Sequence, residues 1–172
     1  MTESTFRALG VAVFTLSDTR TLATDRSGAV LAEGLEAAGH RVLTRSILPD
    51  DLWQVRAALC AAIAEPQVNV VITTGATGIT GRDIAPEAME PLFDKALPGF
   101  GELFRQLSYA DIGASTIQSR ATAGVAGGTL LFAVPGSTNA CQMALEKILI
   151  SQLDLATKPC NFAMLLDRLG ER

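Results

Sequence analysis

The chain has 172 residues, of which 48% are hydrophobic and 19% are charged, with 14 basic residues against 18 acidic ones. This length predicts one domain, and the composition excludes a disordered, collagen-like or coiled-coil protein. The formal net charge of −4 argues against general nucleic-acid binding, which depends on clustered Lys and Arg.

Cysteine and histidine content narrows the classes further. Cys60, Cys141 and Cys160 are far apart and form no C-x-x-C pair, and His40 is the only histidine. This argues against a disulfide framework and against a multi-histidine zinc site, and is typical of a reducing compartment. The apolar stretch 8–16 has about half the length of a membrane-spanning helix. We therefore expect a soluble, cytoplasmic protein with no nucleic-acid and no membrane partner.

Short apolar runs alternate with amphipathic stretches along the chain. After a flexible tail over 1–8, the order is a strand at 11–16, a helix at 29–38, a strand at 41–48, a helix at 52–63, a strand at 68–74, helices at 86–93 and 100–107, strands at 121–126 and 129–134, and a helix at 140–149. Gly127-Gly128 predicts a hairpin between the last two strands. The alternation implies an α/β fold with a mainly parallel sheet covered on both faces.

Three loops follow the carboxyl ends of predicted strands, where open α/β sheets bind ligands. They span residues 17–27, 75–83 and 135–138, and the first carries Asp18, Arg20, Asp25 and Arg26. We expect them to meet at one edge of the sheet.

The loop T-T-G-A-T-G-I-T-G-R-D, residues 73–83, is rich in glycine and threonine. Such a loop lets a ligand approach backbone N–H groups closely, so we predict that Thr74, Gly75, Ala76, Thr77 and Gly78 bind phosphate. Arg82 would be a secondary contact. The alternative is a flexible strand-to-helix turn.

The third loop contains Pro135, Gly136 and Ser137. Ser137 suits a helix N-cap, and the free N–H groups of a helix N-terminus attract anions. A cap without any ligand role is the alternative.

Asp50 and Asp83 lie at element boundaries, and neither contributes to a hydrophobic face. Two carboxylates beside a phosphate loop can hold Mg²⁺, so we predict a metal-binding and catalytic pair. Helix capping is the alternative for each. Ser119 and Arg120 could contact an anion, or Arg120 could be a solvated surface arginine.

Four ordered motifs carry a family resemblance: T-T-G-A-T-G-x-x-x-R-D at 73–83, P-G-F-G-E-x-F-R at 98–105, S-R-x-x-A-G at 119–124 and P-G-S-x-x-A at 135–140. Together they resemble the MoaB/MogA family of molybdenum cofactor biosynthesis proteins over about residues 9–163, with 164–172 as a C-terminal tail. The ending K-P-C-N-F at 158–162 is most similar to the MoaB branch.

The resemblance implies a three-layer αβα fold that assembles as trimers or hexamers. It also implies binding of molybdopterin and, in active members, transfer of AMP from Mg-ATP to its terminal phosphate with release of pyrophosphate. The family's acidic pair matches Asp50 and Asp83, and Ser119 matches a serine that lines the ligand site.

One departure from the family's glycine loop distinguishes between two candidate functions. The family loop is usually T-G-G-T-G, and Ala76 replaces its second glycine. If that position has positive φ, alanine is strained there by about 1 kcal/mol or more; if glycine is there for close approach, the methyl group narrows the pocket. The retained acidic pair favours a molybdopterin adenylyltransferase, whereas Ala76 favours a non-catalytic molybdopterin-binding oligomer. A different nucleotide or flavin binder is a third reading.

Overall fold

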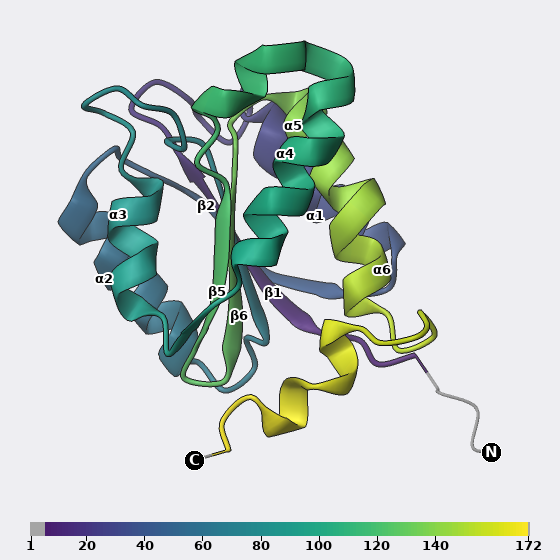
Figure 1. The fold of residues 1–172 in the computed structure, drawn as a ribbon. Coiled ribbons are helices and arrows are strands. Elements are labelled where there is room, and N and C mark those ends of the chain that lie inside the picture. Colours follow the sequence, from purple (N-terminus) through teal and green to yellow (C-terminus); the bar gives the residue numbers. More distant parts are fainter. Residues whose placement is uncertain (1–5, 172) are drawn as a thin grey trace.

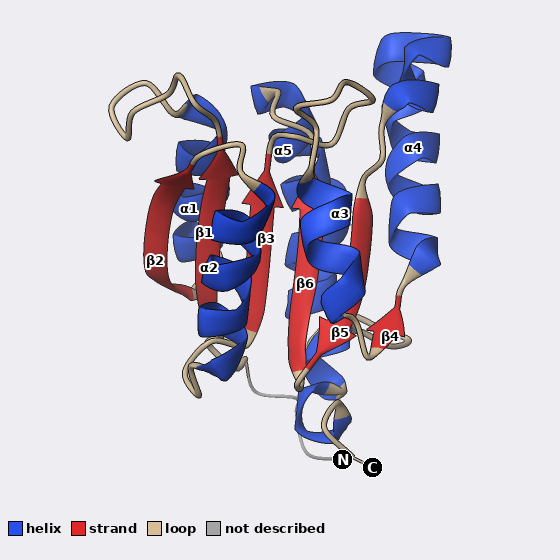
Figure 2. Cartoon of the chain, turned by 90° about the vertical axis from the view of Figure 1, so that its left-hand side faces the viewer, coloured by secondary structure: helices blue, strands red, loops and turns tan. Residues whose placement is uncertain are grey.

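Six strands form one mixed sheet in the computed structural model, which describes residues 6–171. The strands are β1 (Gly10–Leu16), β2 (Arg41–Leu48), β3 (Val70–Thr74), β4 (Lys95–Ala96), β5 (Thr122–Ala126) and β6 (Thr129–Val134). Their order across the sheet is β2-β1-β3-β6-β5-β4, as Figure 2 shows. β2, β1, β3 and β6 run parallel, and β5 and β4 are antiparallel additions.

Helices cover both faces of this sheet (Figure 1). The helices are α1 (Arg26–Ala37), α2 (Leu52–Ala64), α3 (Ala85–Met89), α4 (Pro98–Ile112), α5 (Thr138–Ala144) and α6 (Ile150–Leu153), with a π-helical turn at Leu145–Leu149. α2 and α3 lie on one face, and α1, α4, α5 and α6 lie on the other. The predicted three-layer αβα fold with a late hairpin is confirmed.

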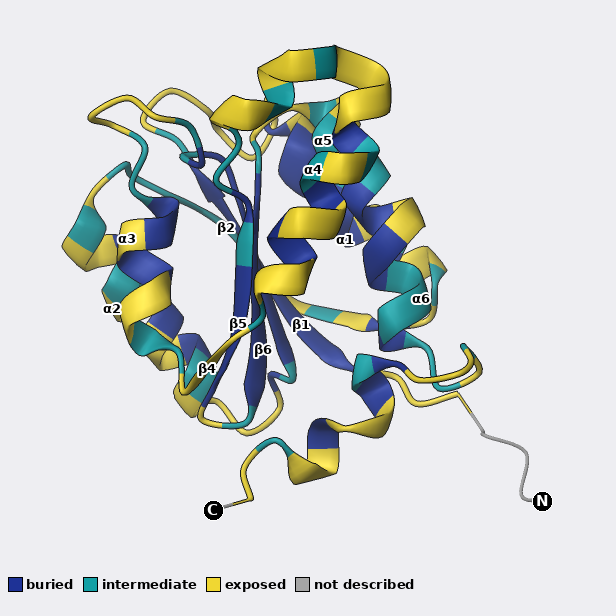
Figure 3. Ribbon diagram, in the orientation of Figure 1, coloured by how far each residue is buried: buried dark blue, intermediate teal, exposed yellow. Residues whose placement is uncertain are grey.

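Alternation along the central strands builds two separate cores. Val11 and Val13 of β1 pack on the α1 side, whereas Ala12 and Phe14 pack on the α2 side. Successive side chains of a strand point to opposite faces, so a strand between two helical layers must be apolar throughout. Figure 3 shows the result: buried strands in the middle and exposed residues on the outer helix faces.

The expected helix over 86–93 is shorter than predicted. α3 ends at Met89, and a 3₁₀ turn continues over Glu90–Leu92. Pro91 has no N–H for an α-helical hydrogen bond, which explains the change.

The predicted tails differ in their packing. Of the tail over 1–8, residues 1–5 lie outside the described residues, and residues 6–8 are exposed coil. In the C-terminal segment, Leu166 is buried and Leu169 packs against the α1-side core, so this end contacts its own domain. Between residues 6 and 171, no helix has both the length and the apolar character that crossing a bilayer requires.

Because β1, β3 and β6 are parallel neighbours, the loops that follow them meet at one edge of the sheet. These are the three loops that the sequence placed there. Hydrogen bonds join them across the edge: the Thr74 hydroxyl donates to the Pro135 carbonyl at 3.0 Å, and the Ser27 hydroxyl donates to the Gly136 carbonyl at 2.7 Å.

Candidate functional site

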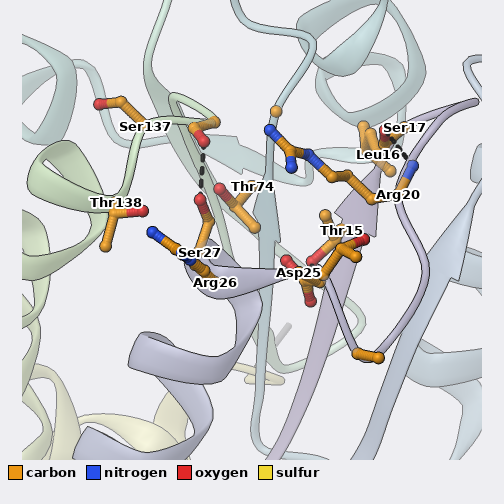
Figure 4. A pocket seen from close by; sticks show the side chains of 14 residues that line it. Thr15, Leu16, Ser17, Arg20, Asp25, Arg26, Ser27, Thr74, Ser137 and Thr138 are labelled. Atoms are coloured by element: carbon orange, nitrogen blue, oxygen red, sulfur yellow. Dashed lines mark hydrogen bonds between the residues drawn. The ribbon is translucent and has the colours of Figure 1, made fainter.

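Two adjoining cavities open at this edge. The larger has a volume of about 560 Å³ and lies between the loop after β1, the N-terminus of α1 and the loop after β6 (Figure 4). Its lining residues are Thr15, Leu16, Ser17, Arg20, Ala23, Thr24, Asp25, Arg26, Ser27, Thr74, Gly75, Gly136, Ser137 and Thr138. The smaller cavity, of about 230 Å³, shares Leu16 and Ser17 with it.

The larger cavity has the chemistry of an anion site. Arg20 and Arg26 are exposed cations in its wall, and most other lining side chains carry hydroxyl groups. In Figure 4 Arg20 extends over Thr74, and Arg26 points toward Thr138. Cations and hydroxyl donors together suit a phosphate group.

Asp25 is a buried carboxylate in the wall of the larger cavity. Its side chain is 1% exposed and accepts hydrogen bonds from the Thr15 hydroxyl and the Gly28 N–H, both at 2.9 Å. Arg45, from β2, donates to the same carboxylate at 3.0 Å. The Arg45 guanidinium therefore compensates the charge of the Asp25 carboxylate inside the protein, and Asp25 also caps α1. The surface of the cavity is left cationic.

Carboxylates surround the smaller cavity. Its lining residues are Leu16, Ser17, Asp18, Thr19, Asp50, Ala76, Arg82 and Asp83. The structure thus brings Asp50 and Asp83 together, as the sequence predicted, and adds Asp18 from the first loop.

Asp50 is free to face this cavity because its neighbour caps the helix. Asp51 is the N-cap of α2 and accepts hydrogen bonds from the N–H groups of Trp53 and Gln54. The capping alternative for Asp50 is therefore wrong. Asp50 Oδ1 is buried and has no hydrogen-bond partner among the described residues. Burial and the nearby Asp18 carboxylate raise the pKa of Asp50, while Arg82 opposes the shift.

Asp83 is held by its own loop and does not cap α3, whose N-cap position is Ile84. Its Oδ2 accepts hydrogen bonds from the Thr80 N–H at 2.9 Å and the Thr80 hydroxyl at 2.7 Å. Burial alone raises the pKa of Asp83, but these bonds and one from the Gly78 N–H outweigh it, so the pKa lies below its usual value. Asp83 is thus a fixed anion.

Arg82 bridges two carboxylates. It forms a close ion pair with Asp18 and lies 3.7 Å from Asp50 Oδ2. The Asp18 carboxylate also accepts a hydrogen bond from the Asp50 N–H at 2.9 Å, and this bond, with Arg82, lowers the pKa of Asp18. Arg82 lines the acidic cavity and its side chain is 68% exposed, so it has room to turn toward a ligand if it gives up its ion pair with Asp18.

The glycine loop is only partly the phosphate cradle that its sequence predicts. The Gly75 N–H donates to the Val134 carbonyl at 3.0 Å, and Gly78 lies against the Asp83 carboxylate. Thr74 is fully buried and Thr77 is 4% exposed. The amide of Gly75 and the hydroxyl of Thr74 therefore hold the loop itself, because a strand-to-helix turn must satisfy its own polar groups before it can offer any to a ligand.

Ala76 adopts the left-handed conformation, with φ of 54°. It follows Gly75, whose φ is 98°. Of the two explanations for a glycine at this position, the structure therefore supports the need for positive φ, and the Ala76 methyl group also lines the smaller cavity.

The third loop behaves as expected. Ser137 is the N-cap of α5 and accepts a hydrogen bond from the Ala140 N–H at 3.2 Å. Gly136 and Ser137 line the larger cavity, whereas the Pro135 carbonyl is bonded to Thr74. A side chain at Gly136 would place Cβ 3.2 Å from the Gly75 Cα, so glycine there allows the two loops to touch.

Ser119 does not join these two cavities. It lines a separate cavity of about 560 Å³ between α3 and α4, together with Arg105 and Arg120. The side chain of Arg120 is committed to protein groups, so it is not the solvated arginine that its sequence position allowed.

The cavity residues from the loop after β1 and the start of α1 were not assigned a role from the sequence; they include Asp18, Arg20, Asp25, Arg26 and Ser27. The only available signal was their concentration in a polar loop directly after the first buried strand. Which of these residues face a cavity depends on how α1 packs beside β1, and no local pattern gives that.

Taken together, the fold and the paired cavities define an α/β protein with a polar, partly cationic site at the carboxyl edge of a parallel sheet, where proteins of this class bind ligands. Residues 12–155 match the family described as "Probable molybdopterin binding domain". The chain belongs to this family.

Known proteins are similar to this chain in sequence and structure over most of its length. It is 50% identical over 152 residues to molybdenum cofactor biosynthesis protein B of Escherichia coli K12, covering 88% of this chain and 89% of that one. A crystal structure titled molybdenum cofactor biosynthesis protein B superposes with a TM-score of 0.86 at 38% identity, over 96% of this chain and 98% of that one. The tungsten cofactor synthesizing protein MoaB of Pyrococcus furiosus gives 0.74 at 42% identity, over 83% and 91%. The resemblance stated from the motifs is confirmed.

Proposed function

We propose that this protein acts in molybdenum cofactor biosynthesis, binds molybdopterin and adenylylates its phosphate with Mg-ATP, releasing pyrophosphate. The family description and the names of the relatives support the biosynthetic role. The observation that carries the enzymatic part is the convergence of Asp50 and Asp83 in a cavity that adjoins a cationic one.

The charges of the two cavities support one arrangement of the two ligands. The larger cavity presents Arg20 and Arg26, which suit the phosphate of molybdopterin without a metal. The smaller cavity has three carboxylates against one arginine, so it would repel a bare polyphosphate. In this proposal the polyphosphate of ATP enters the smaller cavity as its magnesium complex.

The residues present fit Mg²⁺. This ion prefers oxygen ligands and is usually held by one or two carboxylates, with phosphate oxygens and waters completing its shell. Asp50 offers a buried oxygen without a partner, and Asp83 is a fixed anion beside it. Within residues 6–171 no group of three or more His, Cys, Asp and Glu forms a metal cage, which agrees with a metal that arrives with its nucleotide. Bound at Asp50 and Asp83, Mg²⁺ would neutralise charge on the polyphosphate.

In this reaction a phosphate oxygen of molybdopterin attacks the α-phosphorus of ATP. The new P–O bond forms as the bond between the α-phosphorus and the pyrophosphate oxygen breaks, and pyrophosphate leaves with that electron pair. The chain forms no covalent intermediate, so its contribution is positioning and charge compensation. Arg20 and Arg26 would hold the attacking phosphate, and Arg82, released from Asp18, would contact the pyrophosphate.

A second candidate function is a non-catalytic molybdopterin-binding member of the family. Ala76 favours it, because a methyl group in a strained backbone position occupies the wall of the smaller cavity.

For either function we propose that the chain self-associates as a trimer or hexamer, as the family resemblance implies.

A turnover assay with Mg-ATP and freshly released molybdopterin tests the proposal. Adenylylated pterin is followed by chromatography for the native chain and for Asp83→Asn. We expect the variant to lose about a hundredfold or more in turnover, the scale of one electrostatic contact to a transition state.

Asp51→Asn is the matched control. It makes the same chemical change one residue from Asp50, at a side chain that caps α2 and is absent from the lining of both cavities, and Asn is as good a cap as Asp. Pterin binding without product in the native protein would reject the enzyme and leave the binding function. Equal losses in both variants would reject the role of Asp83.

A further inference from the structure

Arg120 fastens both ends of the loop that carries Asp83. Its Nε donates to the Gly78 carbonyl at 2.6 Å, and its Nη2 donates to the Asp83 carbonyl at 2.8 Å. Its backbone N–H donates to the Thr77 carbonyl at 2.9 Å. One residue just before β5 thus holds three carbonyls of the loop between β3 and α3.

The remaining guanidinium nitrogen is also occupied. Nη1 forms a close ion pair with Glu87, in α3. This pair and the two carbonyl contacts orient the planar group, whose donors have a fixed fork geometry that a lysine ammonium does not reproduce.

The middle of this loop has little other support. Thr80, Gly81 and Arg82 are exposed, and a Cβ added at Gly81 would meet no atom within 4 Å. The bonds inside the loop join Asp83 to Thr80 and the Ala85 N–H to the Ala76 carbonyl, and they close the loop on itself without attaching it to the sheet. Apart from Arg120, the attachments to other segments are the Gly75 N–H bond to the Val134 carbonyl at the start of the loop and the exposed ion pair of Arg82 with Asp18.

Arg120 and the carboxylate that it steadies face different cavities. Arg120 lines the cavity between α3 and α4, whereas Asp83 lines the acidic cavity at the sheet edge. Arg120 is absent from the lining of both cavities assigned to ligands. It can therefore act on the site through the loop and through its charge, which helps to lower the pKa of Asp83 and which a lysine would keep.

We propose that Arg120 is a positioning residue: it holds the Asp83 carboxylate in place for the magnesium nucleotide and does not touch the ligand. This role rests on the proposed function, but its structural part can be measured in the protein alone. Without the clamp the loop would open more often, and Asp83 would be in place for a smaller fraction of the time.

Hydrogen exchange of the unliganded protein tests the clamp, with Arg120→Lys compared with the native chain. We expect the hydrogen-bonded amides of Thr80, Asp83 and Ala85 to exchange about tenfold faster, which is the loss of one hydrogen bond to a charged group. Arg105→Lys is the matched control, because Arg105 lines the same cavity and donates to the Ser119 and Ala121 carbonyls without contacting the loop. It should leave the three amides unchanged.

Turnover supplies a second readout. In an active protein, the Mg²⁺ concentration for half-maximal turnover should rise for Arg120→Lys by the ratio of the closed-loop fractions that hydrogen exchange gives for the two proteins, and should not change for Arg105→Lys. Should the native chain show no turnover, the proposed enzymatic function fails, while hydrogen exchange still decides whether Arg120 holds the loop.

Three results would overturn the proposal: unchanged exchange in Arg120→Lys, equal acceleration in the Arg105→Lys control, or a Mg²⁺ dependence in an active protein that does not follow the closed-loop fraction. If Arg120→Lys does not fold, Glu87→Gln replaces it, because it removes only the ion pair. It should then accelerate the same three amides and no others, and uniform or absent acceleration would count against the clamp.

Discussion

Replacing Asp25 with alanine should destabilise this fold more than most single substitutions. The carboxylate is 1% exposed and receives hydrogen bonds from Thr15, Gly28 and Arg45. Loss of the helix cap costs about 1 kcal/mol. Loss of the carboxylate partner of a half-buried arginine costs a further ~1.5–3 kcal/mol. The sum, about 2.5–4 kcal/mol, overlaps the ~3–5 kcal/mol measured when one member of a buried ion pair is removed.

Urea denaturation followed by circular dichroism gives the free energy of unfolding for Asp25→Ala, Arg45→Met and the double variant. The two single changes should not add, because removing Asp25 leaves a buried cation that the double variant no longer has. We expect a coupling energy of about 2 kcal/mol, well above the ~0.5 kcal/mol within which independent sites add.

Asp25→Asn is the control for charge. Asparagine caps helices as well as aspartate does, so only the ion pair weakens, and we expect a loss of about 2 kcal/mol. A loss below ~1 kcal/mol for Asp25→Ala, or additivity in the cycle, would refute the reasoning, because either result means that Arg45 finds equal partners in solvent.

Two further predictions concern the backbone and pH. Ala76→Gly should raise the free energy of unfolding by about 0.5 kcal/mol, because relief of ~1–2 kcal/mol of left-handed strain exceeds the ~0.4–1 kcal/mol of added freedom in the unfolded chain and part of a buried methyl group. Ala58→Gly, inside α2, should instead lower it by about 1 kcal/mol, and equal signs for the two changes would contradict the explanation. Burial lowers the pKa of His40 below its ordinary value of 6.5, and its Nδ1 accepts a hydrogen bond from the Leu9 N–H. The folded state thus prefers the neutral ring, so its contribution is present above about pH 6.5 and is lost as the pH falls from there toward the folded-state pKa. Urea midpoints at pH 7.5 and 5.5 should differ less in His40→Gln than in the native chain, and an undiminished difference would assign the pH dependence to other groups.

Local signals were sufficient for the elements of this fold. The apolar run before Thr74 could only be a strand covered on both faces, and Gly127-Gly128 could turn only between antiparallel strands. Ser137 acts as the predicted cap, since capping depends on groups three residues apart. The boundary of α3 was less predictable, because Pro91 tolerates one further turn in 3₁₀ geometry.

Only part of the candidate site could be predicted from the sequence. Asp50 and Asp83 converge because strand direction is a local property and parallel strands end at one edge. The partners of those side chains were not predictable. Whether the Gly75 N–H is free, or whether Arg120 is solvated, depends on which carbonyls of distant segments lie within 3 Å.

The sequence by itself determined the elements, their layering and the sheet edge at which the three polar loops meet, because helical period, strand alternation and turn chemistry act over a few residues. Only the tertiary structure decided that Asp51 and not Asp50 caps α2, that Ala76 is left-handed, and that Ser119 faces another cavity. Each of these depends on how elements far apart in the chain pack against one another and on which hydrogen-bond partners that packing brings within reach.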